Sequence, residues 1–212
     1  MADEGGFLNA PDVYMEKIAV GGHDLPENLI DLDLPVADNL AQVAQFKKIP
    51  VEALVVCILD RPRHEDLIQQ VRDAGARIVL IGDGDVAGVI AVTDEDTTID
   101  MYMGQGGAPE GVLAAAALRC VGGQFNGRLV FRNDDEKARA RKWGIEDKDF
   151  DRIYKLDELA SGDCIFAATG VTSGSLLDGV KHRRDGTMTT ESVVMRASSG
   201  TVRWIKGEHR KA

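Results

Sequence analysis

The sequence contains no uninterrupted apolar run long enough to span a bilayer, and no signal peptide opens it. It also has no excess of basic residues, because 25 Lys and Arg stand against 35 Asp and Glu, for a formal net charge of −10. Nucleic acids and anionic membranes both attract a basic face, so neither is expected as a partner. These absences predict a cytoplasmic protein that binds neither.

Cysteine is scarce, and internal repeats and low-complexity segments are missing. Cys57, Cys120 and Cys164 lie in or beside apolar runs at wide spacing, which favours reduced thiols in the core over disulfides or a zinc site. A chain of 212 residues, 44% of them hydrophobic, can fill one sizeable domain or two small ones. We expect residues 1–212 to form a single α/β unit.

Three apolar runs alternate with segments that read as helices, and this alternation predicts the fold. The runs cover residues 51–59, 76–81 and 98–103, and the first two read as buried strands. A strand followed by a helix, three times in succession, favours a mostly parallel sheet with flanking helices. We therefore expect an α/β fold.

Other segments extend this framework. Helices are expected over residues 35–48, 65–74 and 134–143. Residues 187–206 read as two strands around Ala197-Ser-Ser-Gly200, which predicts a C-terminal β-hairpin. Residues 164–177 repeat the order of buried strand, glycine turn and helix, and so provide a second candidate for a phosphate-binding loop.

Two local patterns are open to more than one interpretation. Asn126-Gly127 is expected to form a turn within residues 124–131. Tyr14 and Lys17 stand three residues apart and could share a helix face, although Tyr14 also suits the margin of a core.

Residues 104–111, Gly-Gln-Gly-Gly-Ala-Pro-Glu-Gly, join the third apolar run to an alanine-rich helix. We expect a glycine turn, with Pro109 at the first helical position and Glu110 in the first turn, where the helix dipole favours a carboxylate. A helix N-terminus approached over glycines binds anions, so phosphate is the first ligand expected. A carboxylate repels phosphate unless a divalent cation separates them, and the stretch therefore suggests phosphate plus metal. The alternative is that Glu110 only caps the helix and the glycines only make a tight turn.

Two charged loops follow the first two apolar runs. Arg61 and Arg63 flank Pro62 where a strand ends, and guanidinium groups suit phosphate oxygens, although a solvated charged turn would look the same. His64 reads as a helix-start or packing residue.

Gly82, Gly84 and Gly88 make a loose dinucleotide fingerprint after the second run. Asp83 and Asp85 would repel a pyrophosphate and fit sugar hydroxyls or a metal better. Asp-Gly pairs are also frequent in turns for backbone reasons alone.

Five motifs resemble, in order and spacing, the second half of class II fructose-1,6-bisphosphatases. They are Asn9-Ala-Pro-Asp-Val-Tyr-Met-Glu-Lys17, Arg61-Pro-Arg-His64, Asp83-Gly-Asp85, Gly106-Gly-Ala-Pro-Glu-Gly111, and Ala168-Thr-Gly-Val171 followed by Leu176-Leu-Asp-Gly179. The resemblance covers essentially the whole chain. It implies the layered α/β sugar-phosphatase fold and a metal-dependent hydrolysis of the 1-phosphate that yields fructose 6-phosphate and inorganic phosphate, a step of gluconeogenesis.

The resemblance also implies roles for individual residues. Glu110 would be a ligand of a catalytic Mn²⁺ or Mg²⁺ ion. The substrate, fructose 1,6-bisphosphate or sedoheptulose 1,7-bisphosphate, would contact Tyr14, Arg61, Pro62, Arg63, Asp83, Gly84, Asp85 and Gly107. We further expect the protein to assemble as a homo-oligomer.

The sequence departs from this family in one respect. Members carry an Asp-Pro-Ile-(Asp/Glu)-Gly-Thr motif with metal carboxylates and the residue that positions the attacking water, but none of the six prolines here follows an Asp. A two-metal phosphatase needs several carboxylates, and Glu110 is the only matched one. We therefore expect this chain to supply the substrate cradle and to be inactive alone, as a fragment or beside a partner that provides the first half.

Two other functions fit parts of the pattern. A sugar-phosphate binding module without catalysis would keep the cradle and lack the chemistry. A dinucleotide-binding oxidoreductase domain would use residues 82–88.

Overall fold

The computed structural model describes residues 1–94 and 96–210. Within them, a six-stranded sheet has the strand order β3-β2-β4-β1-β5-β6. Its strands are β1 (Tyr14–Gly21), β2 (Val55–Leu59), β3 (Arg77–Ile81), β4 (Met101–Gly107), β5 (Gly123–Val130) and β6 (Ile153–Lys155).

The six-stranded sheet is mostly parallel, with an antiparallel strand in its middle. Strand β2 pairs in parallel with both β3 and β4. Strand β1 lies antiparallel between β4 and β5, and β6 is antiparallel to β5. Strands β2, β3, β4 and β5 therefore point in one direction. This arrangement confirms the α/β fold that the alternation of runs and helices predicts.

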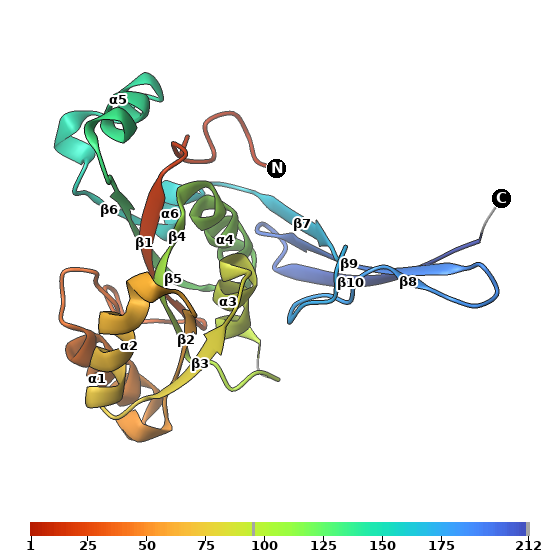
Figure 1. Cartoon of the computed structure of the whole chain (residues 1–212), viewed down its shortest axis with the longest axis horizontal. Helices are drawn as coiled ribbons and strands as arrows, with labels where there is room; N and C mark the ends of the chain where they lie inside the picture. Colours follow the sequence, from red (N-terminus) through yellow and green to blue (C-terminus); the bar gives the residue numbers. More distant parts are fainter. Residues whose placement is uncertain (95, 211–212) are drawn as a thin grey trace.

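Helices cover both faces of this sheet (Figure 1). On one face lie α1 (Val36–Lys47) and α2 (Glu65–Asp73), and on the other lie α3 (Asp85–Ile90) and α4 (Ala108–Val121). The remaining helices are α5 (Asp134–Lys142) and α6 (Leu156–Leu159), with short 3-10 turns η1 (Val51–Ala53), η2 (Pro62–His64), η3 (Ala91–Thr93) and η4 (Asp147–Asp149). Helices α1, α2 and α5 begin and end within one residue of the bounds that the sequence predicts.

A second, antiparallel sheet packs on the far side of α4. It contains β7 (Ile165–Thr169), β8 (Lys181–His182), β9 (Met188–Arg196) and β10 (Thr201–His209). Strands β9 and β10 form the predicted hairpin, which extends away from the rest of the molecule in Figure 1. The layers therefore run helices, sheet, helices, sheet.

The core is divided by the six-stranded sheet into two clusters. Ile18, Leu40 and Ile58 belong to the cluster under α1 and α2, and Met15 and Leu118 to the one around α4. Cys57, Cys120 and Cys164 are buried free thiols, as predicted, with 3.9 Å between the Sγ atoms of Cys120 and Cys164. Because consecutive residues of β1 face opposite sides, this strand contributes to both clusters.

The prediction of a glycine turn at residues 104–107 is wrong, because these residues form the end of β4. They pair with β1 in a continuous register from Lys17↔Gly104 to Tyr14↔Gly107. Tyr14 and Lys17 are therefore strand residues on opposite faces and do not share a helix face. Strand pairing supplies the backbone hydrogen bonds that a turn would have left to a ligand, while Pro109 lies in the first turn of α4 as expected.

The expected turn at Asn126-Gly127 is wrong for a similar reason, because β5 continues through both residues. The Asn126 side chain donates to the Ile30 carbonyl oxygen at 2.9 Å. A Cβ on Gly127 would lie 2.6 Å from the Met15 Sδ atom. Packing and a buried hydrogen bond explain these two residues better than turn chemistry.

Two more interpretations need correction. Strand β3 was expected to be buried but lies at the sheet edge, where the Leu80 side chain is 42% exposed. Residues 170–180 form an irregular loop with no helix, and β7 before them is only partly buried. The Val180 N–H donates to the Val171 carbonyl oxygen at 3.0 Å and folds this loop back on itself. The second phosphate-loop candidate therefore lacks the helix N-terminus on which it depends.

Candidate functional site

The residues that the motifs mark gather at one edge of the six-stranded sheet. Strands β2, β3, β4 and β5 run in one direction, so their carboxyl ends meet at this edge, and the antiparallel β1 begins there. Open α/β sheets place their ligands at this edge. The segments that emerge here carry Tyr14, Arg61, Pro62, Arg63, Asp83, Gly84, Asp85, Gly107 and Glu110.

Arg63 lies across the start of β1 and the end of β4. Its Nε and Nη2 atoms donate to the Gln105 carbonyl oxygen at 3.0 and 2.7 Å, and its Cζ atom lies 4.9 Å from the centroid of the Tyr14 ring. This guanidinium is exposed, and one carbonyl and one ring hold it in place. It therefore retains N–H groups for an anion.

His64 fixes the loop that carries Arg63. It is 2% exposed, its Nε2 atom accepts the Gln105 N–H at 2.8 Å, and its Nδ1 atom lies 2.7 Å from the Leu59 carbonyl oxygen. The ring is therefore neutral, with its proton on Nδ1. Burial lowers the pKa of His64, which keeps the ring in this state. His64 is a packing residue, as its sequence context indicated.

Asp85 forms a buried ion pair with Lys17. The Lys17 Nζ atom lies 2.5 Å from the Asp85 Oδ2 atom, and the lysine side chain is fully buried. Burial lowers the pKa of the Lys17 ammonium, an effect that the nearby charges of Asp85 and Glu110 oppose. The sequence identified Lys17 only as a helix-face neighbour of Tyr14, so the partner of Asp85 was missed.

Two consecutive glycines accommodate the two carboxylates of the site. A Cβ on Gly106 would collide with Asp85 Oδ2, and a Cβ on Gly107 would collide with Glu110 Oε2. Glu110 lies in the first turn of α4 and is exposed. The glycines of this motif thus make room for carboxylates rather than for a turn.

Arg132 is a second guanidinium at this edge, and the sequence analysis missed it. Its Cζ atom also lies 4.9 Å from the Tyr14 ring centroid. Its Nε atom donates to Glu136 Oε1 at 2.8 Å, and that glutamate side chain is 1% exposed. Arg132 follows β5, so treating residues 124–131 as one strand would have placed it at the end of a strand, where ligand groups are expected.

Arg61 and Asp83 lie at the same edge but bond to neighbouring backbone. Arg61 Nη1 donates to the Asp60 carbonyl oxygen at 2.8 Å, and Asp83 Oδ1 accepts the Gly84 N–H at 2.8 Å. Pro62 is exposed at the start of η2. These residues make no hydrogen bond to Tyr14 or Arg63 in the described part of the chain.

The described residues fit only part of a metal site. Among residues 1–94 and 96–210, no group of three or more His, Cys, Asp and Glu side chains lies close enough to hold an ion. Glu110 offers an exposed carboxylate, whereas Lys17 already neutralises Asp85. The described carboxylates of this edge do not form a complete site, so further ligands are needed from elsewhere.

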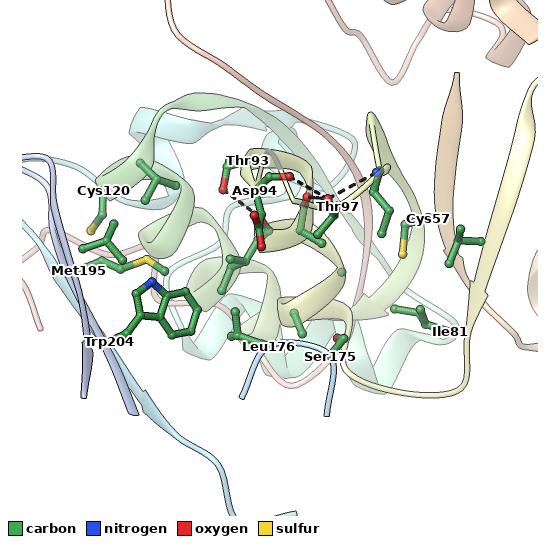
Figure 2. Close-up of a pocket in the computed structure, with 18 of the residues that line it drawn as sticks. Cys57, Ile81, Thr93, Asp94, Thr97, Cys120, Ser175, Leu176, Met195 and Trp204 are labelled. Carbon is green, nitrogen blue, oxygen red and sulfur yellow. Dashed lines mark hydrogen bonds between the residues drawn. The ribbon is translucent and has the colours of Figure 1, made fainter. Parts of the chain in front are cut away.

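Two cavities differ in their relation to these residues. One of about 380 Å³ includes Lys17, Arg63 and His64 in its lining. The other, of about 480 Å³, lies between α3 and the hairpin and is mostly apolar, with Ile81 on one side and Trp204 on the other (Figure 2). Neither lining includes Tyr14 or Glu110.

Comparison with known proteins matches the chain to a family. Residues 1–209 match the model of the family described as bacterial fructose-1,6-bisphosphatase, glpX-encoded. The described part of the chain contains no helix with the length and apolar character to cross a membrane.

Curated relatives give the same result. The chain is 40% identical over 222 residues to D-fructose 1,6-bisphosphatase class 2/sedoheptulose 1,7-bisphosphatase of Trichodesmium erythraeum, with 99% of this chain and 63% of the relative covered. It is equally similar, with the same coverage, to the protein of that name from Crocosphaera subtropica. It is 41% identical over 223 residues to fructose-1,6-bisphosphatase 1 class 2 of Escherichia coli, covering 99% and 65%. The chain thus spans somewhat less than two thirds of these relatives.

Proposed function

This chain belongs to the glpX-encoded family of bacterial fructose-1,6-bisphosphatases, and we propose that it provides the substrate cradle of such an enzyme. The reaction would hydrolyse the 1-phosphate of fructose 1,6-bisphosphate and release fructose 6-phosphate and inorganic phosphate. One observation supports the cradle most directly. Arg63 lies over Tyr14 at the sheet edge where Asp85 and Glu110 also emerge.

Each group at this edge has a chemical task in the proposal. Arg63 binds a phosphate through its free N–H groups, and the Tyr14 hydroxyl adds a donor beside it. Asp83 and Asp85 accept hydrogen bonds from sugar hydroxyls. Arg61, Pro62, Gly84 and Gly107 complete the contact surface, and the missing Cβ of Gly107 leaves room for the Glu110 carboxylate beside it.

Glu110 is proposed as one ligand of a Mn²⁺ or Mg²⁺ ion. Such an ion, when bound, polarises a phosphoryl group and lowers the pKa of a water molecule. Glu110 projects from the first turn of α4 toward Gly107, next to the surface where the bisphosphate would lie. Its task is to hold the cation beside the phosphate and so offset the repulsion between two negative groups.

The substrate range is proposed to include sedoheptulose 1,7-bisphosphate. Two of the relatives carry both bisphosphatase names, and the third carries the fructose name. Both sugars present two phosphates and several hydroxyls, which suits a surface with arginines at one side and carboxylates at the other.

The dinucleotide alternative has little physical support. Gly88 is buried, and a Cβ there would lie 2.9 Å from the Ile81 Cδ1 atom and 3.2 Å from the Cys57 Sγ atom. It therefore serves helix packing and does not face a ligand. The binding module without catalysis differs from our proposal only in turnover after the first half of a relative has been added, because both predict binding and negligible phosphate release by this chain alone.

The test is calorimetric titration of this chain with fructose 1,6-bisphosphate, with Mn²⁺ present, together with an assay of phosphate release. We expect binding and negligible release, because one carboxylate cannot hold two metal ions. Arg63→Ala should weaken binding by about 1.5–3 kcal/mol, the range for a hydrogen bond to a charged group.

Arg77→Ala is the matched control for Arg63→Ala. Arg77 is exposed at the opposite end of the sheet, where it donates to the Ala53 carbonyl oxygen at 2.6 Å. Its loss should leave bisphosphate binding unchanged. An absence of bisphosphate binding by the unmodified chain would overturn the proposed cradle, and robust phosphate release would overturn our account of its incomplete metal site.

A further inference from the structure

Lys17 reaches the candidate site from the middle of a central strand. It lies on β1 between Gly104 of β4 and Gly127 of β5, so both cross-strand neighbours lack side chains. The residue is 1% exposed, and its ammonium ends 2.5 Å from the Asp85 carboxylate. The two glycines thus leave a path of free space through which the Lys17 side chain extends from the core to the site.

The two glycines that bound the motif Gly106-Gly-Ala-Pro-Glu-Gly111 line the same path. A Cβ on Gly106 would lie 3.2 Å from Lys17 Nζ, and a Cβ on Gly111 would lie 3.1 Å from Lys17 Cε. Either methyl group would press on the lysine. The motif that we assigned to phosphate and metal binding therefore also serves to admit Lys17.

Stability alone does not explain this arrangement. A buried lysine and carboxylate lose hydration that their attraction only partly restores, and apolar residues of the same size often replace such pairs without loss. The pair faces a site with another carboxylate, Glu110, whose charge reaches Lys17. What Lys17 changes is the charge of this site, since without it the Asp85 carboxylate would lose the cation that pairs with it.

We propose that Lys17 sets the charge balance of the site, so that the site accepts phosphate and Glu110, but not Asp85, faces the cation. Lys17 neutralises Asp85 and holds its Oδ2 atom, which keeps Asp85 from becoming a second cation ligand. Lys17 is a positioning residue in this scheme, because it acts through Asp85. The inference rests on the proposed function, which takes Glu110 as a metal ligand and phosphate as part of the substrate.

Lys17→Met tests the proposal with two probes. Binding of Mn²⁺ alone is measured by electron paramagnetic resonance, and binding of inorganic phosphate is measured by calorimetry. Methionine keeps most of the length of lysine and removes its charge. We expect Mn²⁺ to bind about tenfold more tightly and phosphate about tenfold more weakly, because the site becomes more negative by one charge. A purely structural lysine would weaken both or neither.

Two further variants keep the test decisive. Lys17→Met combined with Asp85→Asn replaces the ion pair by a neutral pair of similar size, which should fold even if Lys17→Met does not. Its affinities for Mn²⁺ and phosphate should both return to near the original values. Lys47→Met is the control, since Lys47 pairs with Asp100 at 2.6 Å near the opposite end of β4 and should affect neither affinity.

The outcomes separate this inference from the proposed function. If Lys17→Met shifts the affinities for Mn²⁺ and phosphate in opposite directions but fructose 1,6-bisphosphate does not bind, the role of Lys17 is supported and the sugar-bisphosphate cradle is overturned. If fructose 1,6-bisphosphate binds but Lys17→Met shifts the affinities for Mn²⁺ and phosphate in the same direction, the proposed cradle is retained and the role of Lys17 is overturned. Failure of both the unmodified chain and Lys17→Met to bind either probe would overturn the inference as well.

Discussion

The Asp85 carboxylate occupies the space that a Cβ on Gly106 would need. This relationship joins two motifs that are about twenty residues apart in the sequence. Gly106→Ala should therefore displace Asp85, separate it from Lys17 and leave a buried ammonium without its partner. We expect a loss of about 1–3 kcal/mol in the free energy of unfolding, as for other insertions into filled space, measured by urea denaturation.

Gly82→Ala is the control for that experiment. Gly82 follows β3 at the same sheet edge, and an added Cβ there meets no atom of the described structure within 4 Å. Its free energy of unfolding should stay within about 0.5 kcal/mol of the original. Equal stability of the two variants would mean that Asp85 does not need the space beside Gly106.

His64 should make stability depend on pH in the acidic range. Burial lowers its pKa in the folded chain below the ordinary value near 6.5. As pH falls, the unfolded chain takes up the proton first, so stability is complete above about pH 6.5 and is lost as pH falls toward the lower folded pKa. The decrease in Tm from pH 7.5 to 5.5 should therefore be smaller in His64→Gln than in the original chain.

His182→Gln provides the comparison for this measurement, because His182 is exposed on β8. Its Tm should change with pH as in the original chain. If His64→Gln also kept the original pH dependence, the neutral ring bonded to Gln105 and Leu59 would not be the source of the acid sensitivity.

The sequence predicted the parts of the fold that depend on local patterns. Residues 36–47 form a helix because apolar residues recur with helical spacing, and the hairpin around Gly200 follows from alternation and turn residues. Failures occurred where tertiary pairing overrides a local signal. Gly104 and Gly127 look like turn residues, but both are strand residues that leave room for Lys17 between them.

Local sequence patterns likewise predicted only part of the candidate site. Arg63, Asp85 and Glu110 follow strands or open helices, so the sequence brought them to one edge. Lys17 and Arg132 were missed because each depends on how β1 and β5 are placed. Strand β1 is antiparallel at the centre of the sheet, and no local pattern in residues 14–21 indicates its direction.

Arg132 should contribute to anion binding beside Arg63. Both guanidinium groups lie 4.9 Å from the Tyr14 ring centroid, and Glu136 holds Arg132 in place. We expect Arg132→Gln to weaken binding of fructose 1,6-bisphosphate by about 1.5–3 kcal/mol in calorimetry. Glutamine keeps an N–H donor for Glu136, so Tm should change little.

Arg139→Gln is the matched control for Arg132. Arg139 lies 4.0 Å from the same Glu136 carboxylate, on α5, with an exposed side chain. Its loss removes a positive charge near the same carboxylate without removing a group from the Tyr14 ring. Equal weakening by both variants would indicate a general effect of charge, and no weakening by Arg132→Gln would leave that residue as a surface ion pair.

Glu110 is the residue for which capping and metal binding predict different magnitudes. If it only complements the dipole of α4, Glu110→Gln should cost about 0.3–1 kcal/mol of stability and leave Mn²⁺ binding unchanged. If it is a ligand, the substitution removes a formal charge with almost no change of shape, and Mn²⁺ binding should fall by far more than that stability loss explains. We expect the second result in a titration of the chain with Mn²⁺.

Glu65 separates the two roles of a first-turn glutamate. It opens α2 at the same sheet edge and is exposed, as Glu110 is on α4. Glu65→Gln should therefore cost a similar small amount of stability and leave the Mn²⁺ titration unchanged. Identical titrations for Glu65→Gln and Glu110→Gln would exclude Glu110 as a metal ligand. Its carboxylate beside Gly107 would then complement a helix dipole, and the metal would have to be held entirely by residues outside this edge.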